Sequence, residues 1–146
     1  MGLFDDAFGE SKPASLTKEV AFIGILMLAD YSDGTVSDDE MQGFVTAVSR
    51  MKMYRDLSGD QINRLIDRGN KTIRQKGPED ALKLFAQALP EPLHRAVFAN
   101  AVNQVLADGV VEDEEKEFIQ NLRRALGLSG DDANMIAKVM MWKNQG

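Results

Sequence analysis

The chain has 146 residues, of which 44% are apolar and 27% charged, an ordinary composition for a globular domain with one hydrophobic core. Its net charge of -6 disfavours binding to a nucleic-acid backbone, and no apolar run approaches the roughly 20 residues that span a bilayer. The absence of cysteine excludes disulfides, zinc–thiolate sites, iron–sulfur clusters and thiol nucleophiles. Because the N-terminus also lacks the features of a secretory signal, we expect a cytoplasmic protein.

Helix signals dominate the first half of the chain. Ser37 and Glu40 have the spacing of a capping box, and Ser58 and Gln61 repeat it before a later helix. Ser15 is placed to cap the first helix, whose apolar residues recur at three- and four-residue spacing. These apolar residues are Leu16, Val20, Ile23, Leu26 and Met27.

The second half continues in the same way. Pro78 suits the first turn of a short helix, and Ser129 opens the last one. Between them, apolar residues predict a long helix that ends near Val105 and another that includes Phe118 and Leu122. No stretch alternates cleanly between apolar and polar residues as a strand does. The sequence therefore predicts an all-α fold with about seven helices.

Acidic residues are concentrated in two short segments. Residues 30–40 contain five of the 23 carboxylates, and residues 108–117 contain six. LADYSDGTVSDDE at 28–40 and LADGVVEDEE at 106–115 share the order Asp-Gly, five residues, Glu. We call these two segments the first and the second acidic hinge.

The hinges belong to an internal repeat with an offset of 75 residues, and each is followed by the sequence Leu-Ser-Gly-Asp. Each half is therefore predicted to contain a helix, an acidic hinge, a helix, Leu-Ser-Gly-Asp and a further helix. We expect the two pseudo-symmetric halves to pack face to face as one helical bundle. The expected division is a flexible N-terminal segment at 1–14 and a single domain at 15–146, with halves at about 15–76 and 91–143.

The hinges are candidate metal sites. Asp33 and Asp108 are each predicted to end a helix, where a carboxylate would face the negative pole of the helix dipole at a cost of a few tenths to ~1 kcal/mol. Hydrogen bonds from nearby amides or a bound cation would compensate this cost. The spacing fits only the second half of an EF-hand loop, so an authentic EF-hand is excluded. If the packing unites both hinges, their oxygens would suit Ca²⁺, Mg²⁺ or Mn²⁺.

The candidate metal ligands are Asp33, Glu40, Asp108 and Glu115, with Asp30 and Glu112 as auxiliary ligands. A purely structural role is the first alternative, since the capping box fully explains Glu40. It explains Glu115 less well, because Glu112 is a poor N-cap and leaves the box incomplete. A protein-docking patch is the second alternative.

Other candidate residues have ordinary structural interpretations. His94 is the only histidine, which excludes the paired Glu-x-x-His motifs of di-iron bundles and favours a packing role. Trp142 and the adjacent Met140 and Met141 are expected to pack in the core. No nucleophile–base pair or phosphate-binding loop is recognisable, so the chain is not expected to be an enzyme. Basic residues that largely follow helical spacing form a candidate ridge: Arg64, Arg68, Lys71, Arg74 and Lys76.

In the stretches ADGVVEDEEKEFIQNLRRALGLSGDD and SDGTVSDDEMQGF, the sequence resembles the tellurite-resistance TerB family. It is most similar to the stand-alone TerB-like proteins of cyanobacteria, including the opening MGLFD and the closing VMMWKNQG. The resemblance implies two pseudo-symmetric helical halves, an association with tellurite-resistance and chemical-stress operons, and acidic residues that hold a divalent cation. The matching positions are Asp33, Glu40, Asp108 and Glu115. The first hinge departs from the pattern through Asp30, Tyr31 and Ser32.

Two functional hypotheses follow. In the first, the chain is a non-catalytic module of the tellurite or chemical-stress response that binds a divalent cation through both hinges. In the second, it is an adaptor that docks a partner protein on its acidic hinges or basic ridge and needs no metal. Neither hypothesis involves nucleic acid or a membrane span.

Overall fold

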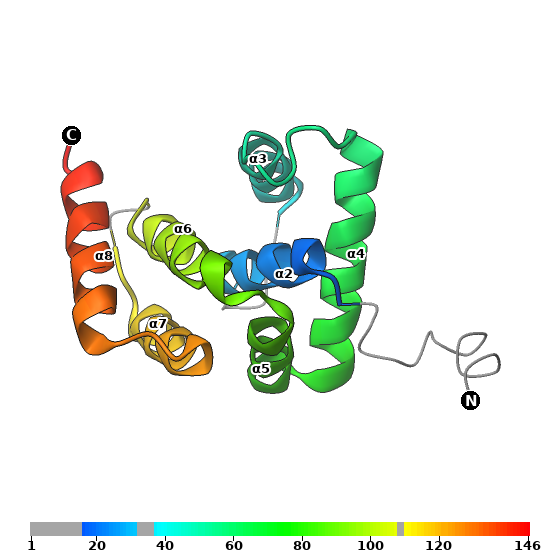
Figure 1. The fold of residues 1–146 in the computed structure, drawn as a ribbon. Helices are drawn as coiled ribbons and strands as arrows, with labels where there is room; N and C mark the ends of the chain where they lie inside the picture. The colour runs from blue at the N-terminus through cyan, green and yellow to red at the C-terminus, as the bar shows by residue number, and fades with distance from the viewer. Residues whose placement is uncertain (1–15, 32–36, 108–109) are drawn as a thin grey trace, which may run out of the picture.

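In a computed structural model of the chain, the structure describes residues 16–31, 37–107 and 110–146, which form seven α-helices and one short 3₁₀ helix (Figure 1). The first half contains α2 (Lys18–Asp30), α3 (Asp38–Ser49) and α4 (Gly59–Lys76). The connection contains α5 (Pro78–Ala88) and the 3₁₀ helix η3 (Glu91–Leu93). The second half contains α6 (His94–Ala107), α7 (Asp113–Leu126) and α8 (Gly130–Lys143). Within these ranges there is no strand, so the predicted all-α class is confirmed.

Helix α2 lies at the centre of the bundle (Figure 1). Every residue from 20 to 29 is buried, because α4, α5 and α6 pack around the helix and α7 also contacts it. The predicted apolar stripe is thus part of a helix that is apolar on all sides, as expected for a fully buried helix. Its N-cap is Thr17, whose Oγ1 accepts a hydrogen bond from the Val20 N–H at 3.3 Å. The prediction that Ser15 caps this helix is therefore wrong.

The two halves repeat the same order of elements. Helices α2 and α6 pack on each other, and each packs on the third helix of its own half, α4 or α8. Both Leu-Ser-Gly-Asp segments start that third helix. Ser58 accepts the Gln61 N–H at 3.1 Å, and Ser129 accepts the Asp132 N–H at 3.1 Å. The local sequence signals therefore lie at equivalent places in both halves.

A glycine allows the helices around α2 to approach closely. A Cβ atom added to Gly24 would lie 2.5 Å from the Cζ atom of Phe85, a fully buried residue of α5. A Cβ atom on Gly69 of α4 would lie 3.6 Å from the Gly24 Cα atom and 3.3 Å from the Met27 sulfur. Gly24 is therefore required by packing, although glycine in a helix costs roughly 1 kcal/mol relative to alanine.

Helix α8 lies at one side of the bundle and packs on α6 (Figure 1). Ile136 and Met140 face the core as expected. In contrast, Trp142 is 61% exposed and Met141 is 51% exposed, so the prediction that they pack in the core is wrong. An edge helix has only part of its surface covered, and these side chains lie on the uncovered part. None of the described helices is both long enough and apolar enough to cross a bilayer.

We predict that Gly24→Ala lowers the free energy of unfolding by about 1–3 kcal/mol, because the new methyl group collides with the buried Phe85 ring. Gly43→Ala is the matched control, since Gly43 lies inside α3 and a Cβ atom there meets nothing within 4 Å. This control should be stabilised by up to about 1 kcal/mol. Urea denaturation in the presence of chelator measures both values. Equal stability of the two variants would contradict the packing argument.

Candidate functional site

The described parts of the two acidic hinges border one cavity of about 530 Å³, which we call the hinge cavity. Its walls come from the C-terminal ends of α2 and α6, from α3 and from the first turn of α7. Three of the six predicted metal ligands line it: Asp30, Glu40 and Glu115. The remaining lining residues are Ala29, Tyr31, Gly43, Phe44, Ala47, Asn103, Gln104 and Ala107.

Residues at equivalent positions of the repeat face the hinge cavity. Glu40 and Glu115, which are related by the offset of 75 residues, both line it. The same offset relates Ala29 to Gln104, and these two residues line it as well. The packing of α2 on α6 thus brings described parts of both hinges to one place, as the repeat suggested.

Both repeat-related glutamates also take part in helix capping. Glu40 Oε1 accepts the Ser37 N–H at 3.2 Å, while Ser37 Oγ accepts the Glu40 N–H at 3.1 Å. Glu115 Oε1 accepts the N–H of the N-cap residue Glu112 at 2.9 Å. Glu115 therefore has the capping role that the sequence left in doubt. In each glutamate these bonds use Oε1, and the second carboxylate oxygen takes no part in them.

Two further residues that line the hinge cavity have polar groups that the sequence did not identify as candidate ligands. The Tyr31 hydroxyl and Gln104 Oε1 are buried and have no hydrogen-bond partner among the described residues. The Tyr31 ring packs on Phe44 with 5.8 Å between the ring centroids, and Gln104 Nε2 donates to Asp30 Oδ2 at 3.3 Å. Tyr31 drew attention only as a departure from the family pattern, and no sequence signal identifies Gln104.

Two carboxylates act on the hydroxyl of Tyr31, a residue that lines the hinge cavity. Burial raises the pKa of the Tyr31 hydroxyl, and the negative charges of Asp30 and Glu40 act in the same direction; together they raise this pKa to about 12. These two carboxylates come from different helices, α2 and α3, yet both act on the same hydroxyl. A cation placed there would be attracted by both charges.

The described residues do not form a complete metal-binding group. Asp33 and Asp108 lie outside the described residues, so the structure does not give the distance between their carboxylates. Glu112 is described but is not part of the cavity lining. Within the described ranges, no group of three or more acidic or histidine side chains is arranged to hold a metal ion. The described lining of the hinge cavity therefore contains the side-chain oxygens of Asp30, Tyr31, Glu40, Gln104 and Glu115. The remaining hinge residues follow or precede these residues in the sequence.

The sequence profile of the family described as "Tellurite resistance protein TerB" matches residues 19–138, which covers most of both halves. The chain belongs to the TerB family. This finding confirms the resemblance seen in the two hinge sequences. No curated protein and no solved structure matches the chain significantly.

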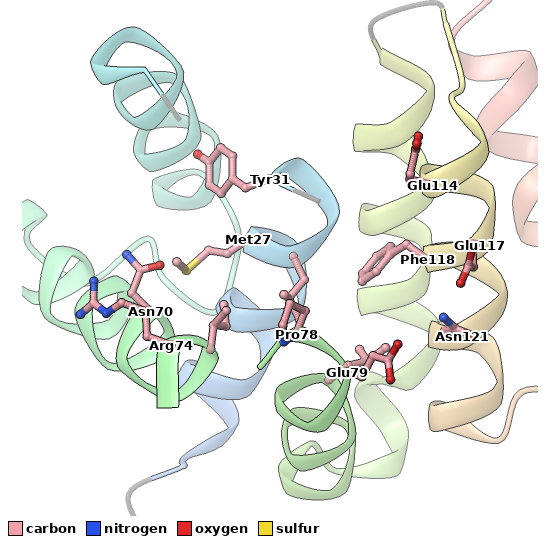
Figure 2. Close-up of a pocket in the computed structure, with 13 residues that line it drawn as sticks. Met27, Tyr31, Asn70, Arg74, Pro78, Glu79, Glu114, Glu117, Phe118 and Asn121 are labelled. Carbon is pink, nitrogen blue, oxygen red and sulfur yellow. The ribbon is translucent and has the colours of Figure 1, made fainter. Parts of the chain in front are cut away.

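A second cavity of this TerB-family chain is an apolar cleft of about 520 Å³ between α2, α4, α5 and α7 (Figure 2). Met27 and Phe118 are among its apolar residues, and Glu114 and Glu117 of α7 lie on one side. Arg74, which belongs to the candidate basic ridge, lies on the opposite side. The lining of the cleft as described contains no histidine, serine or threonine.

The remaining candidates behave as surface or packing residues. All five residues of the basic ridge are exposed on α4. His94 is partly buried, and its Nε2 atom lies 2.9 Å from the Leu89 carbonyl oxygen in the Pro-rich corner. This contact agrees with the packing role expected for the only histidine of the chain.

We predict that Tyr31→Phe raises the free energy of unfolding by up to about 1 kcal/mol in chelator at neutral pH, because it removes a buried hydroxyl without a described partner. Tyr54→Phe is the matched control, since the Tyr54 hydroxyl donates to the Glu19 carbonyl oxygen at 2.7 Å. Losing that bond should lower the free energy of unfolding by about 1 kcal/mol. Chemical denaturation checks both, and a destabilised Tyr31→Phe variant would show that the hydroxyl has a stabilising partner.

The pH dependence of the free energy of unfolding provides a second test of the Tyr31→Phe variant. Tyr31 ionises near its ordinary pKa of 10.0 in the unfolded chain but only at about 12 in the folded chain. The unfolded state therefore loses this proton first, and stability falls as the pH rises from 10 to 12. Tyr31→Phe should show a shallower alkaline loss of stability than the unsubstituted chain. Identical slopes would contradict the raised pKa.

Proposed function

We propose that this chain is a non-catalytic module of the response to tellurite or related chemical stress that binds a divalent cation at the hinge cavity. The observation that supports this most is that carboxylates from both halves line one cavity together with Tyr31 and Gln104, whose side-chain oxygens have no hydrogen-bond partner in the described part of the chain. Family membership supports the stress context. The cytoplasmic location expected from the sequence is part of the same proposal.

The proposed ligands are the oxygens of the two hinges. Asp30, Glu40 and Glu115 would approach the cation from the described part of the cavity, Asp33 and Asp108 from the adjoining parts of the hinges, and Glu112 as an auxiliary ligand. A set of carboxylate, phenol and amide oxygens suits Ca²⁺, Mg²⁺ or Mn²⁺ better than softer metals. Such a cation would neutralise the charges that meet there and join the two halves at the hinges.

Calorimetry and thermal unfolding of chelator-treated protein with Ca²⁺, Mg²⁺ and Mn²⁺ test the proposal. A bound ion must stabilise the folded state, by about 2.7 kcal/mol at a free concentration of one hundred times Kd. Glu40→Gln and Glu115→Gln separate binding from folding, because glutamine keeps the oxygen that a capping box needs. Each variant should keep its stability in chelator within about 0.5 kcal/mol and lose about tenfold or more in ion affinity.

Glu114→Gln is the control for the charge change. Glu114 is exposed, precedes Glu115 directly and lines the apolar cleft instead of the hinge cavity. Its removal should leave the ion affinity unchanged. An absence of both heat and stabilisation at millimolar ion would reject cation binding. An equal loss in all three variants would mean that the ions only screen the net charge.

The alternative function is a protein adaptor that works through the basic ridge. It is supported by the exposure of all five ridge residues, none of which forms an ion pair within the described ranges. Arg64, Arg68 and Lys71 follow one another at spacings that place them on one side of α4. The partner surface expected for such a ridge is acidic.

We expect reversal of Arg64, Arg68 and Lys71 to glutamate to abolish capture of this acidic partner if the adaptor function is correct, while a chelator has no effect on capture. The measurement is a pull-down with the purified full chain, in the presence and absence of chelator. Reversal of Lys52, Lys83 and Lys116, which are exposed and lie outside α4, controls for the change in net charge with the same number of substitutions. If capture persists after reversal of the ridge but is lost in chelator, the result would instead favour partner binding through the acidic hinges with a bound cation.

A further inference from the structure

Exposed apolar side chains are concentrated on α8. Among the described residues, five large apolar side chains are exposed, and four of them belong to this helix. These four are Met135 at 59%, Val139 at 44%, Met141 at 51% and Trp142 at 61%. The fifth, Val110, lies in the second acidic hinge. Scattered single apolar residues are normal on a surface, but several on one helix indicate a contact surface.

Three of these side chains form a stripe. Met135, Val139 and Trp142 are separated by four and three residues, which places them on one face of the helix. With Asp131, Asn134 and Lys138 they line a shallow groove of about 310 Å³. We call this surface, made of these six residues, the outer face of α8.

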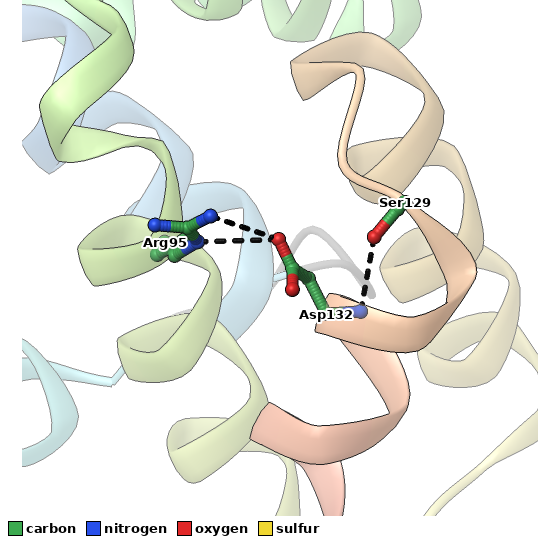
Figure 3. A network of polar contacts seen from close by, with 3 residues as sticks. All are labelled: Arg95, Ser129 and Asp132. Carbon is green, nitrogen blue, oxygen red and sulfur yellow. Dashed lines mark hydrogen bonds and ion pairs between the residues drawn. The ribbon is translucent and has the colours of Figure 1, made fainter.

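The contacts of α8 with α6 hold the outer face away from the core. Near the start of α8, Asp132 Oδ2 pairs with Arg95 Nη2 at 3.0 Å, and Ser129 caps the helix by accepting the Asp132 N–H (Figure 3). At its end, Asn144 Nδ2 donates to Asn103 Oδ1 at 2.9 Å. Both ends of α8 are therefore tied to α6, and the apolar stripe is turned outward by the fold itself.

We propose that the outer face of α8 binds a second copy of the chain, through a two-fold symmetric and antiparallel pair of α8 helices. Charge favours this partner, because the first turn carries the exposed Asp131 and the last turn carries the exposed Lys143. In an antiparallel pair, Asp131 of each copy lies level with Lys143 of the other. Asp132 is already engaged by Arg95, which leaves Asp131 for this contact.

The apolar residues match in the same register. The pair Asp131–Lys143 and the pair Met135–Val139 are both centred on residue 137. One antiparallel alignment therefore places unlike charges together at both ends and apolar side chains together between them, as an isologous interface requires. Lys138 of each copy lies near the axis, where its long side chain can cover apolar surface while its ammonium group stays in water.

The expected dimer is weak. A helix of 14 residues is about 21 Å long, and one helix pair buries less than the roughly 800 Å² per partner of a standard interface. The net charge of -6 on each copy also opposes association until salt screens it. Dimerisation should therefore depend on concentration and become stronger at moderate salt.

Sedimentation equilibrium of the full chain over a wide concentration range tests this inference, in chelator and independently of the proposed cation site. Trp142 is the only tryptophan, so its fluorescence should shift to shorter wavelength as the dimer forms. Val139→Asp should weaken association about tenfold or more. Val110→Asp is the matched control, because it places the same charge on an exposed valine outside α8 and should leave association unchanged.

Exchanging the charges of Asp131 and Lys143 tests whether the partner is a second copy of the chain. Asp131→Lys and Lys143→Asp should each weaken self-association when studied alone, because each creates like charges at both ends of the pair. An equimolar mixture of the two variants should associate about as strongly as the unsubstituted chain, because opposite charges then meet at both ends.

Three results would overturn the inference. One is a chain that stays monomeric at the highest concentration reached. Another is equal weakening by Val110→Asp and Val139→Asp, which would place the contact outside α8. A third is a Trp142 fluorescence shift that requires anionic phospholipid vesicles, which would assign the outer face of α8 to a membrane surface.

Discussion

The burial of α2 on every side is the constraint on which the rest of the structure depends. A helix without a polar face is stable only when neighbours cover its whole circumference, and α4, α5 and α6 do so with a further contact from α7. Gly24 lets the Phe85 ring approach the helix axis. The chain first becomes exposed again at Asp30, where α2 leaves the core. The position of the first acidic hinge is thus a consequence of how far the core extends along α2.

The repeat extends this constraint to the second hinge. Because α6 packs on α2, the C-terminal ends of both helices lie beside the same cavity, and the described carboxylates Asp30, Glu40 and Glu115 line it. The charges of Asp30 and Glu40 meet at the Tyr31 hydroxyl and help to raise its pKa. The packing of α6 on α2 therefore places acidic residues of both halves beside one cavity. Their carboxylates make the surroundings of this cavity negatively charged.

Much of the fold could be predicted because helix starts depend on bonds between residues three apart. The Ser37–Glu40 and Ser58–Gln61 boxes and the Ser129 cap all form as expected. Features that depend on distant neighbours were less accessible. Helical spacing shows that α8 has apolar residues on two faces but cannot show that only one is covered, which explains the error at Trp142. Gln104 reaches the cavity because of the packing of α6 on α2, which no local pattern contains.

The hinge glutamates show why sequence alone could not separate a structural role from a binding role. A glutamate three residues after an N-cap uses one oxygen for the cap amide, as Glu40 and Glu115 do, and still has a second. The cap bond restricts the side chain, so part of the entropy lost when a ligand is bound is already lost on folding. In the proposed cation site, the cap bond would therefore restrict the side chain without occupying the second oxygen. The Asp-Gly…Glu spacing is therefore compatible with capping alone and with capping combined with the proposed cation binding.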